Sequence, residues 1–176
     1  METFEVVVLG SLRQRFRQVK ETGERAIAQL SIDDLRWSPD EVSNSIAVII
    51  QHLHGNMLSR WTDFLTSDGE KPWRERDREF ESDGNLAAEE LMQRWEAGWA
   101  CLFAALDGLK PADLTREVVI RGQPLTVIDA LHRQLAHCSD HVGQIVWIAK
   151  ARKGKEWQTL SIARGQSRGY RPTQKD

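Results

Sequence analysis

Apolar side chains recur every three or four residues in four long stretches of the chain. This spacing places them along one face of an α-helix, with charged residues on the opposite face. The four stretches span about residues 2–30, 38–65, 86–109 and 126–153. The second opens on Ser38, Pro39 and Glu41, a helix-start signal, and the fourth stops before Gly154. The pattern therefore predicts an all-α fold, a four-helix bundle.

The segments between these helices differ in character. Residues 31–40 are predicted to turn, and residues 66–85 are polar and highly charged, which predicts a long surface crossover. Residues 115–127 change to an alternating pattern around Gly122, so we expect a short extended hairpin or an irregular link before the last helix. A partly ordered tail is expected from about residue 155. The 176 residues are predicted to form a single domain.

Three histidines are the main candidates for chemistry. His137 and His141 are four residues apart on the predicted last helix, so their imidazoles lie one turn apart on one face. His52 lies on the inward face of the second helix, whereas His54 points about 200° away from it and His132 lies on another face of the last helix. If the two helices pack together, the three nitrogens form a site with an open coordination position. The alternative is that they are ordinary core or surface histidines.

Other residues near these histidines are weaker candidates for a role in binding or catalysis. The residue after His137 is Cys138, so the HExxH pattern of zinc peptidases is absent. Cys138 projects about 100° away from its neighbour round the helix and is interpreted as structural. Asn56 and Gln144 lie about one turn beyond two of the histidines, where an amide would orient a ligand, a metal-bound water or a substrate. Ordinary hydrogen bonding within the bundle is the alternative for both amides.

Charge and composition exclude several classes of function. The net charge of -2, with both signs spread along the chain, predicts no binding to nucleic acid. The longest apolar runs are far shorter than the roughly 20 residues of a membrane span. The N-terminal segment lacks the basic leader of a signal peptide, so a cytoplasmic location is expected, with both cysteines reduced. The run WRERDREFE is interpreted as a solvated crossover rather than a grip for an anionic substrate.

Three segments resemble the DinB/YfiT-like superfamily: IIQHLHGNMLSRW, TDFLTSDGEKPWRERDREFE and HCSDHVGQIVWIAK. The resemblance covers nearly the whole chain and is to a branch of small bacterial proteins of unknown function. In this superfamily, a four-helix bundle holds a divalent metal through one histidine of the second helix and a His-x-x-x-His pair before a Gly-Gln on the last. The matching residues are His52, His137, His141, Gly143 and Gln144. Many relatives carry a further histidine where this chain has Val142.

The resemblance implies a divalent metal ion as cofactor, zinc or nickel first, with iron or manganese as alternatives. Characterised members include metal-dependent transferases that use low-molecular-weight thiols and a thiol-dependent isomerase. Because a divalent cation lowers the pKa of a thiol or water bound to it, the expected function is a thiol S-transferase or a hydrolase acting on a small molecule. A homodimer is expected. The alternatives are a non-catalytic metal or small-ligand binding protein, connected with stress, and a structural dimer module.

Overall fold

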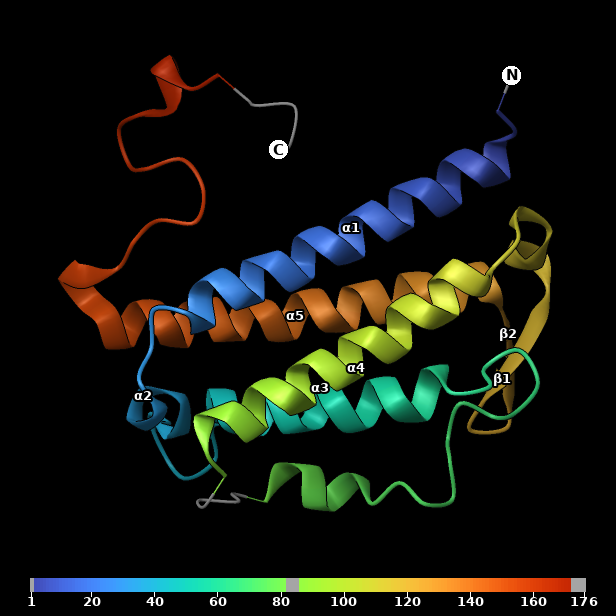
Figure 1. Ribbon diagram of the computed structural model, residues 1–176, viewed down its shortest axis with the longest axis horizontal. Helices are drawn as coiled ribbons and strands as arrows, with labels where there is room; N and C mark the ends of the chain where they lie inside the picture. The colour runs from blue at the N-terminus through green and yellow to red at the C-terminus, as the bar shows by residue number, and fades with distance from the viewer. Residues whose placement is uncertain (1, 82–85, 172–176) are drawn as a thin grey trace.

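The computed structural model describes residues 2–81 and 86–171 as a helical bundle with one small hairpin (Figure 1). The helices are α1 (Phe4–Ile27), α2 (Ile32–Arg36), α3 (Ile46–Trp61), α4 (Ala88–Gly108) and α5 (Val127–Lys153), and the strands are β1 (Glu117–Ile120) and β2 (Gln123–Thr126). Short 3-10 helices cover Arg76–Phe80, Pro111–Thr115, Gly154–Glu156 and Ser167–Gly169. Four long helices dominate the structure, which confirms the predicted all-α bundle.

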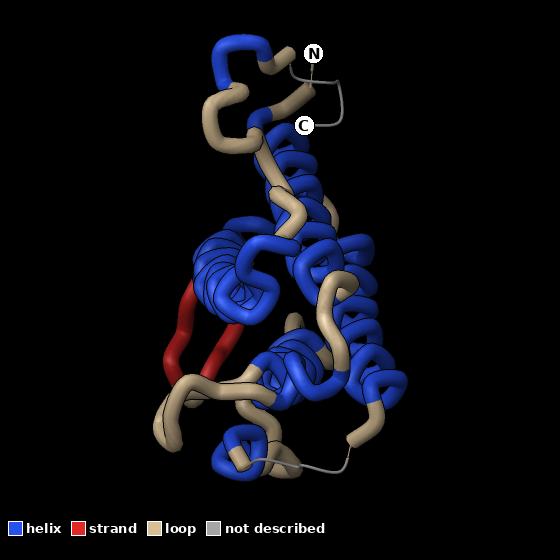
Figure 2. The backbone as a smooth tube through the Cα atoms, turned by 90° about the vertical axis from the view of Figure 1, so that its left-hand side faces the viewer, coloured by secondary structure: helices blue, strands red, loops and turns tan. Residues whose placement is uncertain are grey.

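The long helices enclose a core with two tryptophans near its centre. α1 packs on α5 and α3 packs on α4, and Figure 2 looks roughly along these helices. Trp95 and Trp99 of α4 are both 0% exposed, and their rings meet edge to face with centroids 5.5 Å apart. Such a pair stabilises a core by about 0.5–1.5 kcal/mol beyond the area that it buries. The spacing of four residues places both rings on the inward face of one helix.

The second long helix begins later than predicted. The carboxylate of Asp40 accepts the backbone N–H groups two and three residues further on, at 3.0 and 2.8 Å. Such a local bond competes with helix formation and favours a turn. The hydroxyl of Ser45 then accepts the N–H three residues later at 3.2 Å and caps α3. The predicted start at Ser38 is therefore wrong: α3 begins at Ile46, and it ends at Trp61 rather than at residue 64 or 65.

The stretch that was predicted to turn after the first helix contains the short helix α2. Ser31 and Asp34 form a capping box, in which the Ser31 hydroxyl accepts the Asp34 N–H at 3.2 Å and the Asp34 carboxylate accepts the Ser31 N–H at 3.1 Å. Arg152 of α5 donates to the same carboxylate at 2.8 Å. α1 accordingly ends at Ile27, before residue 30.

The crossover between α3 and α4 is attached to the hairpin that precedes α5. β1 and β2 pair antiparallel, which confirms the predicted hairpin. Arg121 and Gly122 both have positive φ, 55° and 70°, as a two-residue hairpin turn requires. The carboxylate of Asp68 in the crossover accepts the N–H groups of these two residues at 2.8 and 2.7 Å. The last part of the predicted crossover, residues 82–85, lies outside the described residues.

The first part of the chain after α5 packs on the bundle through Trp157 and Leu160. Gly154 has φ 52°, and α5 ends there as predicted. The side-chain amide of Gln29 donates to the backbone oxygen of Gln158 at 3.1 Å and accepts its N–H at 2.9 Å. Residues 164–171 are exposed, and Figure 1 shows this segment away from the helices. Residues 172–176 lie outside the described residues, and the division into one domain and a tail stays a prediction.

Within residues 2–81 and 86–171, no helix is long and apolar enough to cross a membrane.

Two glycines of α1 provide a matched test of the packing between α1 and α4. A Cβ on Gly23 would lie 2.6 Å from the Trp95 ring, whereas a Cβ on Gly10 would meet nothing within 4 Å. We expect Gly23→Ala to lower the free energy of unfolding by about 1–3 kcal/mol through overpacking. Gly10→Ala is expected to raise it by up to about 1 kcal/mol, because alanine favours the helix. Urea unfolding measures both, and equal effects would contradict the close approach.

Candidate metal centre

Three histidines from two helices converge between α3 and α5. Nitrogen atoms of His52, His137 and His141 all lie within 4.8 Å of one another. Nε2 of His52 is 3.0 Å from Nε2 of His137, and the rings of His52 and His141 have centroids 4.9 Å apart. His52 is 4% exposed, and the other two are partly buried. The structure thus brings together the three histidines that the sequence analysis selected.

The two remaining histidines lie away from this cluster, as their helical positions predict. His54 borders a separate hollow with Arg94 of α4, and burial, followed by the charge of Arg94, lowers its pKa. His132 is exposed on α5, with Nδ1 3.0 Å from the backbone oxygen of Ile128. His132 therefore provides a natural control for substitutions at the cluster.

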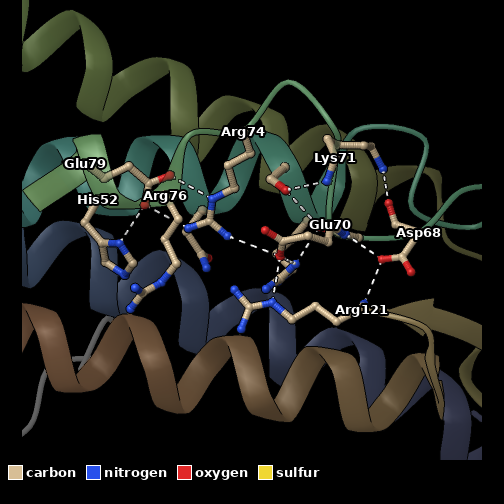
Figure 3. Close-up of polar contacts among 12 residues, drawn as sticks. His52, Asp68, Glu70, Lys71, Arg74, Arg76, Glu79 and Arg121 are labelled. Carbon is tan, nitrogen blue, oxygen red and sulfur yellow. Dashed lines mark hydrogen bonds and ion pairs between the residues drawn. The ribbon is translucent and has the colours of Figure 1, made fainter.

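A buried carboxylate binds His52 through the ring nitrogen that does not face His137. Oε2 of Glu79 lies 2.9 Å from Nδ1 of His52, and Arg74 donates to both oxygens of Glu79, at 2.7 and 2.8 Å (Figure 3). The side chains of Arg74 and Glu79 are 2% and 9% exposed. Because an ionised carboxylate only accepts, Nδ1 of His52 donates to it, and Nε2 is the nitrogen that faces His137. Carboxylate–histidine pairs of this kind orient the ligands of metal sites.

The protonation state of His137 and His141 and the distance between His52 and His137 both fit a transition-metal ion. Burial, followed by the charges of His141 and His52, lowers the pKa of His137 to about 3. Burial and the charge of His52 also lower the pKa of His141. The imidazoles of His137 and His141 are therefore neutral, as metal ligands must be. In a tetrahedral zinc site with bonds of about 2.0–2.1 Å, neighbouring nitrogens are roughly 3.3 Å apart, close to the 3.0 Å observed between His52 and His137.

The three histidines line a cavity of about 440 Å³. Its walls come from α3, the crossover, the hairpin and α5. Trp61, Phe64 and Ile120 contribute apolar surface, and Asn56 and Gln134 contribute amides. This volume lies within the range of roughly 300–1,000 Å³ that is typical of small-molecule sites.

The two amides that the sequence analysis selected have different surroundings. Asn56 is 8% exposed and lines the histidine cavity, and its Oδ1 accepts the Nε2–H of Gln134 at 3.0 Å. Gln144 is exposed and borders a second hollow beside Trp147. A role in binding stays a prediction for each, and Asn56 is the better placed of the two to meet a ligand in the cavity.

The groups that support His52 were not predicted from the sequence. The run WRERDREFE was interpreted as a solvated crossover, which is wrong for Arg74 and Glu79, because their side chains are buried. It holds for Arg78, whose side chain is 72% exposed. Gly55 was missed as well: a Cβ at this position would overlap the carboxylate of Glu79. The sequence does contain one signal of this contact, the glycine one turn after His52. A glycine on a helix permits a second segment to approach closely at that point.

Cys138 does not belong to the histidine cluster. Its side chain is 0% exposed, and Nε2 of Gln134 lies 3.2 Å from its Sγ. Burial raises the pKa of the thiol to about 12, so it stays protonated. A protonated, inaccessible thiol is neither a nucleophile nor a metal ligand. Its position is consistent with a structural role.

The buried ion pair between Arg74 and Glu79 is expected to support the fold as well as His52. Glu79→Ala leaves the guanidinium of Arg74 buried without its carboxylate, and we expect a loss of about 3–5 kcal/mol in the free energy of unfolding. Glu75→Ala removes the partner of Arg78, a pair in which both side chains are more than half exposed, and is expected to cost less than about 1 kcal/mol. Chemical denaturation measures both variants. Similar losses in the two would show that the buried pair has no special role.

Comparison with known proteins gives one family. A search of the curated proteins finds no match to the chain. A family model described as "Protein of unknown function (DUF1572)" matches residues 4–166. The matched range includes all five α-helices and all three histidines of the cluster. The chain therefore belongs to the DUF1572 family.

Proposed function

We propose that the protein is a DinB-like, metal-dependent enzyme whose ligands are His52, His137 and His141. The observation that carries this proposal is the convergence of three imidazoles from two helices on one point. Three nitrogen ligands and no carboxylate favour zinc or nickel, with iron or manganese as alternatives. The resemblance of the histidine motifs to DinB/YfiT-like proteins supports the same ligand set.

The surrounding residues would prepare the site for binding. Glu79 would fix the ring orientation of His52, with Nε2 turned toward the other two histidines. A metal held by these three histidines would leave a position for a ligand and would lower the pKa of a coordinating thiol or water. The apolar side chains of Trp61 and Phe64 would keep bulk water away from a bound substrate. We propose that the reaction is thiol S-transfer or hydrolysis on a small molecule.

The alternative function is metal or small-ligand binding without catalysis. The observation that favours it is that the described residues lining the cavity include no Asp, Glu, Lys, Tyr or Cys that would serve as a general acid or base. Activation of a thiol by the metal itself needs no such group, so we place the enzyme first. Cytoplasmic location and a homodimer stay predictions, and the mass of the protein in solution measures the second.

The ligand set is tested by metal content. The protein is expected to retain about one equivalent of zinc or nickel after desalting, and His52→Ala, His137→Ala and His141→Ala are each expected to lose it, because two imidazoles bind far more weakly than three. His132→Ala changes an exposed histidine of α5 and is expected to retain the metal. Elemental analysis measures all five proteins. Stoichiometric metal in all three cluster variants would exclude this ligand set.

Measurement of turnover distinguishes the proposed enzyme from a protein that only binds a metal or a small ligand. The metal-loaded protein is assayed with a thiol and 1-chloro-2,4-dinitrobenzene for S-transfer, and with 4-nitrophenyl acetate for hydrolysis. The enzyme predicts turnover in one of the two assays that His137→Ala abolishes and His132→Ala preserves. A metal-loaded protein whose rates equal those of His137→Ala in both assays would favour binding alone.

A further inference from the structure

The cavity that contains the histidines is strongly cationic. Five arginines line it, and the described residues of its lining include no Asp or Glu. The arginines come from α3, the crossover, the hairpin and α5, and they are Arg60, Arg74, Arg76, Arg121 and Arg133. Four separate segments therefore direct positive charge into one pocket.

Three of these arginines pair with carboxylates outside the cavity lining, and these carboxylates neutralise part of their charge. Glu70 accepts from Arg60 at 2.8 Å and from Arg121 at 2.9 Å, and Glu79 accepts from Arg74 at 2.7 and 2.8 Å (Figure 3). Two carboxylates thus offset two of the five charges. An excess of positive charge remains on the cavity side.

The other two arginines have no strong partner. The guanidinium of Arg76 lies 4.9 Å from the centre of the Phe80 ring, and the Phe80 ring lies 4.7 Å from that of His52. Its nearest carboxylate, that of Asp77, is 3.8 Å away and fully exposed. Arg133 lies one turn before His137 on the same face of α5, and within the described ranges it forms no hydrogen bond or ion pair. Both are therefore available to a ligand near the histidines.

Two buried donors in the same wall also lack an acceptor. Nη1 of Arg74 and Nε1 of Trp61 are inaccessible to solvent and have no hydrogen-bond partner among the residues that the structure describes. Arg74 is 2% exposed as a side chain, and its closest approach to Glu70 through Nη1 is 3.8 Å, beyond hydrogen-bond distance. Neither atom is accessible to a ligand, whereas the side chain of Arg76 is 49% exposed.

We propose that the cavity binds a small organic anion, with its carboxylate or phosphate group held by Arg76 and Arg133 and its apolar part against Trp61 and Phe64. Guanidinium groups bind both anions through paired, charge-assisted hydrogen bonds. The inference rests on the proposed function in one respect: it names the substrate class of the same site, an anion whose reactive group faces the three histidines. The charge of a bound divalent metal would add to the same preference.

The test compares an anion with a neutral molecule of similar shape. Calorimetry measures the binding of 3-phenylpropionate, phenyl phosphate and 3-phenylpropan-1-ol to the full chain, both metal-free and zinc-loaded, at one ionic strength. At least one of the two anions is expected to bind roughly tenfold or more tightly than the alcohol in both forms, as a charge-assisted bond allows. The stronger of the two anions identifies the group that the arginines prefer.

Substitutions of the two arginines test whether they cause the preference for an anion over the alcohol. Arg76→Gln and Arg133→Gln are each expected to weaken binding of the anion by roughly threefold to tenfold, and together to abolish its advantage over the alcohol. Arg78→Gln is the matched control, because Arg78 belongs to the same 3-10 helix but is 72% exposed and lies outside the cavity lining. It is expected to leave binding unchanged.

The outcomes separate this inference from the proposed function. Equal affinity for anion and alcohol, or equal effects of Arg76→Gln and Arg78→Gln, would overturn the anion site. A preference seen only with zinc and insensitive to Arg76 and Arg133 would also overturn it, because the anion would then contact the metal alone. A chain that binds no metal but keeps the arginine-dependent preference would refute the proposed function while supporting this inference.

Discussion

The side chain of Glu79 is buried between the guanidinium of Arg74 and the imidazole of His52. A carboxylate in such a position is stable only if its partners stay in place, so the 3-10 helix that carries Glu79 must be seated firmly on α3. Gly55 permits the seating, because any Cβ there would overlap the carboxylate. The crossover thus determines how His52 meets the two histidines of α5.

The same crossover connects the two chemical environments of the cavity. Near Glu79 it supports the imidazole of His52, and near Glu70 it gathers the guanidinium groups of Arg60 and Arg121. Asp68 fastens it to the turn of the hairpin through two backbone N–H groups. The crossover therefore contributes to the histidine cluster through Glu79 and to the cationic wall through Arg74 and Arg76. This arrangement suits a substrate with a reactive group at one end and an anionic group at the other.

The parts of this structure that could be predicted from sequence are those with local periodicity. Helical spacing placed His137 and His141 on one face of α5, and the inward stripe of α3 selected His52 over His54. The burial of Glu79 could not be read in this way, because WRERDREFE contains both the buried Arg74 and the exposed Arg78, each followed directly by a glutamate. Which of them is buried depends on where the crossover meets α3. That contact is tertiary and leaves no period in the sequence.

The most direct test of the central claim is an anomalous-scattering map from crystals of the protein grown without added metal. The account predicts one peak between α3 and α5, about 2.0–2.1 Å from a nitrogen of each of the three histidines, with the absorption edge identifying the element. A fully ordered site with no peak at this position, or with the imidazole of His52 turned away from the two histidines of α5, would contradict it.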